Sequence, residues 1–189
     1  MIKNLSWRLK ILNNTKRTIF RTKDLQKIWG DNERTTVFTA KRMVQKELIF
    51  KLSKGYYALS RDYNYYELAN ALIIPSYVSF NSALLLHGVC FQVSDSIDSV
   101  SPIYKRKQVD GKNFSYHSMK KDLFLNNEGI EHRDNVILAT PERAILDSFY
   151  FGYNPNIDNE DKINKTYLKR LAKLYPQTIQ NEIKRYYDK

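Results

Sequence analysis

The sequence predicts a mixed α+β protein built from two parts. Three observations support this fold class: both helix-like and strand-like apolar patterns occur, apolar residues make up 42% of the chain, and its positive charge is concentrated in residues 1–62. With 189 residues, the chain is long enough for two small domains that each bury a core. We therefore expect one domain at residues 1–62 and a second at residues 63–189.

The first part begins with two short helices. Leu5, Leu9 and Leu12 recur at helical spacing and predict a helix that ends near residue 13. Thr22 is suited to cap a second helix, and Gly30 can end it in a left-handed conformation.

A third, more basic helix follows a tight turn and is expected at Glu33–Lys46. At about 100° per residue, Val37, Ala40 and Val44 share one face, which we expect to be buried. The opposite face would then carry threonine hydroxyls and basic groups, which can bind base edges and phosphates.

A hairpin comes next in the sequence. Leu48–Leu52 and Tyr56–Leu59 read as strands on either side of Ser53-Lys54-Gly55, where glycine supplies the positive φ of a turn. Ile19 and Phe20 can add a further short strand. This order of elements is typical of a winged helix-turn-helix domain, in which one helix enters a DNA groove.

The charge distribution agrees with a DNA-binding role for this part. Residues 1–62 hold 15 Lys and Arg against 5 Asp and Glu, whereas residues 63–189 hold 16 against 15. An ordinary solvated helix face is the alternative for any single side chain. The expected partner is double-stranded operator DNA, which can contain inverted repeats. The residues predicted to contact it are Lys23, Arg34, Thr35, Thr36, Thr39, Arg42, Lys46 and Lys54.

The second part reads as a mixed α/β domain with closing helices. Strands are expected at Ser96–Pro102, Phe114–Met119 and Asn135–Ala139, and two final helices are expected on either side of Pro176. The cationic run Lys105–Lys107 is expected in a solvated loop.

Two segments of the second part carry recognisable motifs. Residues 75–89 read PSYVSFNSALLLHGV, and residues 139–147 read ATPERAILD. In this order behind a winged helix, over roughly residues 20–150, they resemble the AbiEi family of antitoxin-like regulators from bacterial abortive-infection, type IV toxin–antitoxin systems. The resemblance implies an antitoxin domain, regulation of its own operon, and a nucleotidyltransferase toxin as functional partner, with or without direct binding.

The motif positions also have a structural interpretation. Ser79 and Gly88 can cap and end one helix, with His87 as a capping or core histidine. An i, i+4 ion pair between Arg143 and Asp147 is expected to contribute only tenths of a kcal/mol, as exposed helix pairs do. The motif residues carried over from the family pattern are Pro75, Ser79, His87, Gly88, Pro141, Glu142, Arg143 and Asp147.

No constellation of an enzyme is present in the sequence. Three histidines, one cysteine and isolated glycines give neither metal-ligand spacing nor a phosphate-binding loop, so we expect no catalytic activity, no metal and no cofactor. Without a long apolar run, a cytoplasmic protein with no membrane contact is expected.

Two function classes therefore remain. The first is a DNA-binding repressor that controls its own operon and acts as a type IV antitoxin. The second is a protein-interaction or ligand-sensing module of a defence system, in which DNA binding is secondary, because two-thirds of the chain lies outside the basic part.

Overall fold

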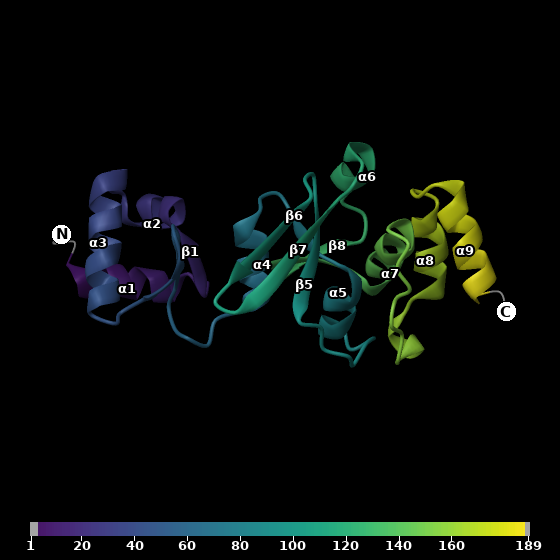
Figure 1. The fold of residues 1–189 in the computed structure, drawn as a ribbon, viewed down its shortest axis with the longest axis horizontal. Coiled ribbons are helices and arrows are strands. Elements are labelled where there is room, and N and C mark those ends of the chain that lie inside the picture. The colour runs from purple at the N-terminus through teal and green to yellow at the C-terminus, as the bar shows by residue number, and fades with distance from the viewer. Residues whose placement is uncertain (1–3, 188–189) are drawn as a thin grey trace. The chain divides into compact units, whose positions relative to one another are not determined.

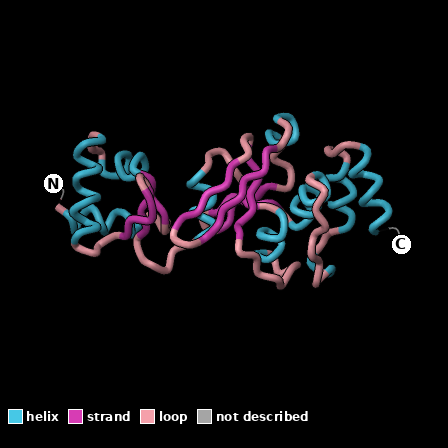
Figure 2. The backbone as a smooth tube through the Cα atoms, in the orientation of Figure 1, coloured by secondary structure: helices cyan, strands magenta, loops and turns pink. Residues whose placement is uncertain are grey.

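The computed structural model describes the backbone of residues 4–187 and the side chains of residues 4–185. Over this range the protein is a mixed α+β structure with nine α-helices, a three-stranded antiparallel sheet and a six-stranded mixed sheet (Figures 1 and 2). The predicted α+β class is thus confirmed. The chain forms two compact units, Met1–Ala71 (unit 1) and Leu72–Lys189 (unit 2).

Over its described residues, unit 1 has four helices and a small sheet, and its first three helices pack with the sheet around one apolar core. The sheet has the strand order β1-β3-β2, and Leu12, Phe20, Trp29 and Met43 are among the fully buried core residues. The elements in chain order are α1 (Leu5–Asn14), β1 (Ile19–Arg21), α2 (Thr22–Trp29), α3 (Glu33–Gln45), β2 (Phe50–Ser53), β3 (Tyr56–Ala58) and α4 (Tyr65–Leu72).

The turn between α2 and α3 is fixed at both of its ends. Gly30 ends α2 in the left-handed region at φ 63°, as predicted. The Asn32 side chain caps α3 by accepting a hydrogen bond from the Thr35 backbone N–H at 2.9 Å. Between them, Asp31 forms a largely buried ion pair with Arg8 of α1. The start of α3 is therefore tied to the first helix.

Helix α4 belongs to unit 1 and extends it beyond the boundary predicted at residue 62. Glu67 is only 4% exposed, and its carboxylate accepts hydrogen bonds from the Thr18 backbone N–H at 2.9 Å and the Thr18 hydroxyl at 2.7 Å. The Ile19 backbone N–H lies 3.3 Å from the other carboxylate oxygen. These bonds hold α4 against the start of β1, so the unit ends at Ala71.

Unit 2 is organised on the six-stranded sheet, whose order is β6-β7-β5-β4-β9-β8. The β5–β7 and β4–β9 pairs are parallel, and the remaining neighbours are antiparallel. The strands are β4 (Tyr77–Val78), β5 (Ser96–Ser101), β6 (Lys105–Val109), β7 (Lys112–Ser118), β8 (Ile130–Arg133) and β9 (Val136–Ala139).

Strand β6 corrects the sequence-based interpretation of Lys105–Lys107, which we expected in a loop. These residues pair with Tyr116, Ser115 and Phe114 of β7 in an antiparallel register. Three consecutive cations hide the apolar alternation on which strand prediction depends, whereas at a sheet edge their long side chains reach water.

Helices pack on unit 2 in a consecutive series. Helix α5 lies on β5 and against α7, α8 packs on α7, and α9 packs on both (Figure 1). The two closing helices predicted around Pro176 are confirmed. The helices are α5 (Phe80–Leu86), α6 (Lys121–Leu125), α7 (Pro141–Tyr150), α8 (Lys165–Ala172) and α9 (Gln177–Tyr187), with a 3-10 turn at Glu160–Lys162.

A buried ionic network joins these layers. Arg143 and Asp147, both on α7, have fully buried side chains and form an ion pair at 3.3 Å between Nε and Oδ1. Asp147 also accepts hydrogen bonds from the Ser79 hydroxyl and the Tyr175 hydroxyl, each at 2.6 Å. The prediction of an exposed helix pair worth only tenths of a kcal/mol is therefore wrong.

Several elements hold the Arg143 guanidinium, although its Nε atom makes no hydrogen bond among the described residues and lies in ion-pair contact with Asp147. The guanidinium donates to the backbone carbonyls of Leu123 at 2.9 Å and Glu128 at 3.1 Å, and to the Tyr77 hydroxyl at 3.3 Å. Burial and the adjacent Asp147 carboxylate raise the pKa of the Tyr175 hydroxyl well above its ordinary value, so this hydroxyl stays protonated and remains a donor.

Replacing Asp147 with alanine should leave Arg143 as an uncompensated buried charge. We expect D147A to lower the free energy of unfolding by about 3–5 kcal/mol, as when one partner of a buried ion pair is removed. Y175F should cost less, about 1–3 kcal/mol, because only one hydrogen bond to Asp147 is lost. Urea denaturation measures both, and D161A, at an exposed position, serves as the matched control. Equal stability of D147A and D161A would contradict the assigned role of the network.

Candidate nucleic-acid interface

The exposed face of α3 carries cations, hydroxyl and amide groups together with two apolar side chains. Phe38 is 62% exposed and Val37 is 45% exposed, which is unusual for large apolar residues on a short helix. Lys46, which follows the last turn, is exposed as well. The exposed residues within the helix are Glu33, Arg34, Thr35, Val37, Phe38, Lys41, Arg42 and Gln45.

The opposite face of α3 differs from the predicted one. Thr36 is fully buried and Thr39 is 8% exposed, so neither can contact DNA as predicted. Thr36 donates its hydroxyl to the Asn32 carbonyl at 2.9 Å, which satisfies this polar group inside the helix. Threonines can be buried when their hydroxyl is bonded in this way. The buried face of α3 is therefore rotated about the helix axis from the predicted face, and Val37 is exposed instead of buried.

Nine of the arginines and lysines of unit 1 form two groups. Arg8, Arg17 and Arg21 form ion pairs with Asp31 or Asp24 and stabilise the fold. The second group is exposed and makes no ion pair with any carboxylate in the part of the chain that the structure describes. Its members near α3 and the hairpin are Lys23, Arg34, Lys41, Arg42, Lys46 and Lys54.

The hairpin turn lies against the start of α2. The Thr22 backbone N–H donates to the Gly55 carbonyl at 2.9 Å, and Gly55 has the positive φ of 84° that the turn was predicted to need. Because Thr22 precedes Lys23 and Gly55 follows Lys54, this bond brings the backbones of the two lysines close together. Both lysines are exposed and can reach a phosphate.

The motif residues of unit 2 lie mainly in structural positions. Ser79 precedes α5, yet its hydroxyl donates to Asp147 rather than capping the helix. Ring Nε2 of His87 lies 2.9 Å from the Ala139 carbonyl oxygen, and Glu142 accepts from the Asn164 backbone N–H at 2.8 Å.

The remaining motif positions shape the backbone. Pro141 occupies the first turn of α7, Gly88 has a φ of 69° after α5, and Pro75 follows a cis peptide bond before β4. The contacts that join the α5 segment to α7 and β9 come from Ser79 with Asp147 and from His87 with the Ala139 carbonyl.

Three candidates for DNA contact escaped the sequence prediction. Phe38, Lys41 and Gln45 lie on the exposed face, at positions i+4, i+7 and i+11 from Arg34. Counting cations rather than apolar residues along the helix would have identified this face.

No metal centre or membrane-crossing segment was found in the described part of the chain. Over that part, no group of three or more His, Cys, Asp or Glu side chains could hold a metal ion. Nor does any helix there combine the length and the apolar character that crossing a bilayer requires. No protein-family model matches the sequence, and no relative is found among curated proteins.

The same substitution at two adjacent positions tests the orientation of α3. T36K places an ammonium group in the core and should lower the free energy of unfolding by about 3 kcal/mol or more. T35K, on the exposed face, should change it by less than about 0.5 kcal/mol. Urea denaturation of the two variants provides the comparison. Similar losses for both would show that α3 is not oriented as described.

Proposed function

We propose that the protein is a DNA-binding transcriptional repressor that regulates its own operon and acts as the antitoxin of a type IV toxin–antitoxin system. In this proposal, unit 1 is a winged helix-turn-helix domain: α2 and α3 form the helix-turn-helix, and the β2–β3 hairpin is the wing. Helix α3 enters the major groove, and the wing contacts the backbone.

The exposed, unpaired cations of α3 carry the DNA-binding proposal. Arg8 and Arg21 pair with carboxylates of the fold, whereas Arg34, Lys41 and Arg42 form no ion pair with any carboxylate that the structure describes. Unit 1 holds 15 Lys and Arg against 6 Asp and Glu, a net charge of +9. An excess of this kind on one unit attracts the phosphate backbone of nucleic acid.

The apolar residues on the same face support base reading. Phe38 lies between cations, and the Arg42 guanidinium is 6.0 Å from its ring centroid. Aromatic and aliphatic side chains contact the methyl group of thymine in the major groove, and arginine binds guanine. We therefore assign phosphate contacts to Lys41 and Lys54 and base contacts to Phe38 and Arg42.

A gel-shift titration on the promoter of the chain's own operon tests this assignment. K41A and K54A should weaken binding to all DNA sequences, and each should reduce the slope of log K against log salt by about one. F38A should reduce the preference for the operator over unrelated DNA and leave that slope unchanged.

Two controls accompany this titration. K121A removes an exposed lysine from unit 2 and should leave the affinity unchanged. Failure of the unaltered chain to retard its promoter at low salt, or the same salt slope for K41A and the unaltered chain, would refute the proposal.

The antitoxin role rests on the motifs of unit 2 and not on the α3 surface. The segments at residues 75–89 and 139–147 resemble the AbiEi pattern, and Ser79, Arg143 and Asp147 from these segments are joined in one buried network. Motif residues that hold a domain together fit a family defined by a common fold. The toxin expected from this resemblance is a nucleotidyltransferase, neutralised with or without direct binding.

Coexpression in bacteria tests the antitoxin role separately from DNA binding. We expect the operon to encode a nucleotidyltransferase whose expression stops growth, and expression of this chain should restore growth because the antitoxin opposes the toxin. The variant with both K41A and R42A, expressed from an independent promoter, should still restore growth. Persisting toxicity with stably folded chain present would exclude the antitoxin role and leave the DNA-binding proposal intact.

A further inference from the structure

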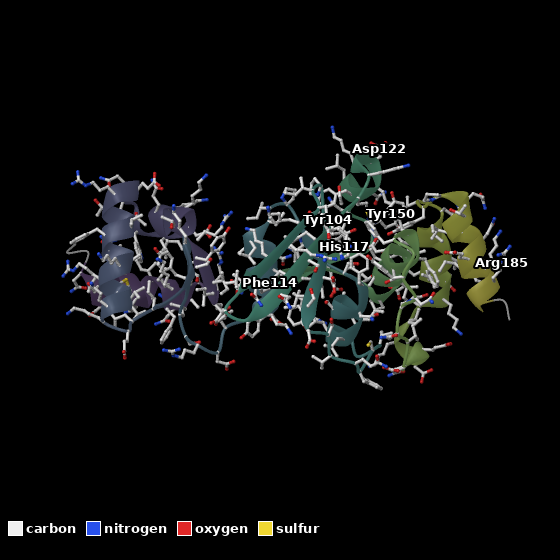
Figure 3. The ribbon with its side chains drawn as sticks, viewed as in Figure 1. Tyr104, Phe114, His117, Asp122, Tyr150 and Arg185 are labelled. Carbon is white, nitrogen blue, oxygen red and sulfur yellow. The ribbon has the colours of Figure 1, made fainter. Side chains whose placement is uncertain are left out.

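A cavity of about 510 Å³ lies in unit 2, and none of the residues that line it is assigned above to DNA contact. Its floor is the face of β5, β6 and β7, and residues at the start of α5 and after α7 form its walls. Figure 3 labels His117 on β7 in this part of unit 2. The volume is in the range of about 300–1,000 Å³ that small-molecule sites occupy.

Polar residues occupy the cavity floor in one row across three strands. Asp98 of β5 pairs with Ser115 of β7, and Ser115 pairs with Arg106 of β6. Side chains alternate along each strand, so their neighbours Ile97 and Phe114 face the other way and are buried. At about 4.8 Å per strand, the Asp98 and Arg106 backbones lie about 10 Å apart.

Asp98 is held in place from two directions. His117 Nε2 lies 3.1 Å from its Oδ1 atom, and the Asp98 backbone N–H donates to the Ser82 hydroxyl at 2.9 Å. The Asp98 side chain remains 26% exposed, whereas the side chain of His117 is only 12% exposed. A fixed, partly exposed carboxylate on the floor of a cavity can accept hydrogen bonds from hydroxyl or amino groups of a ligand.

Aromatic rings form the wall beside this carboxylate. The Phe80 ring centroid lies 4.6 Å from that of His117 and 5.9 Å from that of Tyr153. Tyr153 is 49% exposed, so part of its ring is available to a ligand. Phe80 has a φ of 55°, a strained conformation for a residue with a side chain.

Arg106 provides the positive end of the cavity. It is exposed and forms no ion pair among the described residues, although its guanidinium lies 5.8 Å from the Tyr104 ring. Arginine binds phosphate through two parallel hydrogen bonds. The cavity thus offers a cation and a carboxylate in one row across the strands, with an aromatic wall beside the carboxylate.

We propose that this cavity is a binding site for a nucleoside monophosphate. The phosphate binds Arg106, the base stacks on Tyr153, and Asp98 accepts hydrogen bonds from ribose hydroxyls or from amino groups of the base. A fully anionic ligand does not match the carboxylate, and a neutral aromatic ligand leaves Arg106 without a partner. A nucleotide supplies both groups at the two ends of one molecule.

Isothermal titration of the full chain with AMP, GMP, CMP and UMP tests the site. At least one nucleotide should bind, and R106Q should weaken that binding about tenfold or more because a charge-assisted hydrogen bond to phosphate is lost. K105Q is the matched control, since it removes the same charge from the neighbouring position of β6, which faces the opposite side of the sheet. K105Q should bind the nucleotide with the affinity of the unaltered chain.

A second readout follows the ring of His117 by NMR. Of the three histidine signals, the one that disappears in H117N should shift on addition of the nucleotide, because a stacked base changes its magnetic environment. D98N keeps an oxygen acceptor for His117 and should fold, and it should bind both the nucleotide and adenosine more weakly. Thermal unfolding of each variant confirms that it is folded.

The proposal would be overturned if none of the four nucleotides bound, or if inorganic phosphate bound as tightly as the nucleotide. It would also be overturned if adenosine bound as tightly as AMP, or if K105Q and R106Q lost the same nucleotide affinity. R42A, on α3, separates this site from the DNA surface. Loss of nucleotide binding in R42A would assign the binding to unit 1, whereas unchanged binding supports the cavity. Failure of the gel-shift experiment would not affect this result, because the cavity shares no residue with α3.

Discussion

The ion pair between Arg143 and Asp147 is the interaction on which the packing of unit 2 depends. Two opposite charges are removed from water, and the cost is offset by their mutual attraction and by hydrogen bonds with hydroxyls and carbonyls of other elements. The surroundings leave little room for change: a Cβ atom added at Gly129 would lie 2.9 Å from the Cβ of Arg143. A change in α5, α7 or the segment before α9 would therefore disturb the same pair.

Unit 1 uses ionic contacts differently, to orient a surface. The buried pair of Arg8 and Asp31 ties the turn before α3 to α1, and Glu67 of α4 holds the start of β1. With these charges committed to the fold, the cations on α3 remain available to solvent. A cationic helix that is already rigidly placed would lose less conformational entropy on binding to DNA than a mobile one.

Features of the fold that depend on neighbouring residues could be predicted from the sequence, whereas features that depend on partners far along the chain could not. Gly30 ends α2 through a local backbone conformation, and this end of the helix was predicted from the sequence. The burial of Thr36 depends on packing against other helices, and the burial of Arg143 depends on partners many positions away. The polar row on β5, β6 and β7 was equally hidden, because only the strand order places Asp98 and Arg106 on either side of Ser115.

The cations of β6 also disfavour pairing between separate copies of the chain. Strand β6 ends the six-stranded sheet, so one side of its backbone lacks a strand partner within that sheet. Exposed edges of this kind promote aggregation through new strand pairing. Lys105, Arg106 and Lys107 would face the same three charges on an approaching copy, and this repulsion disfavours growth of the sheet from one molecule into the next.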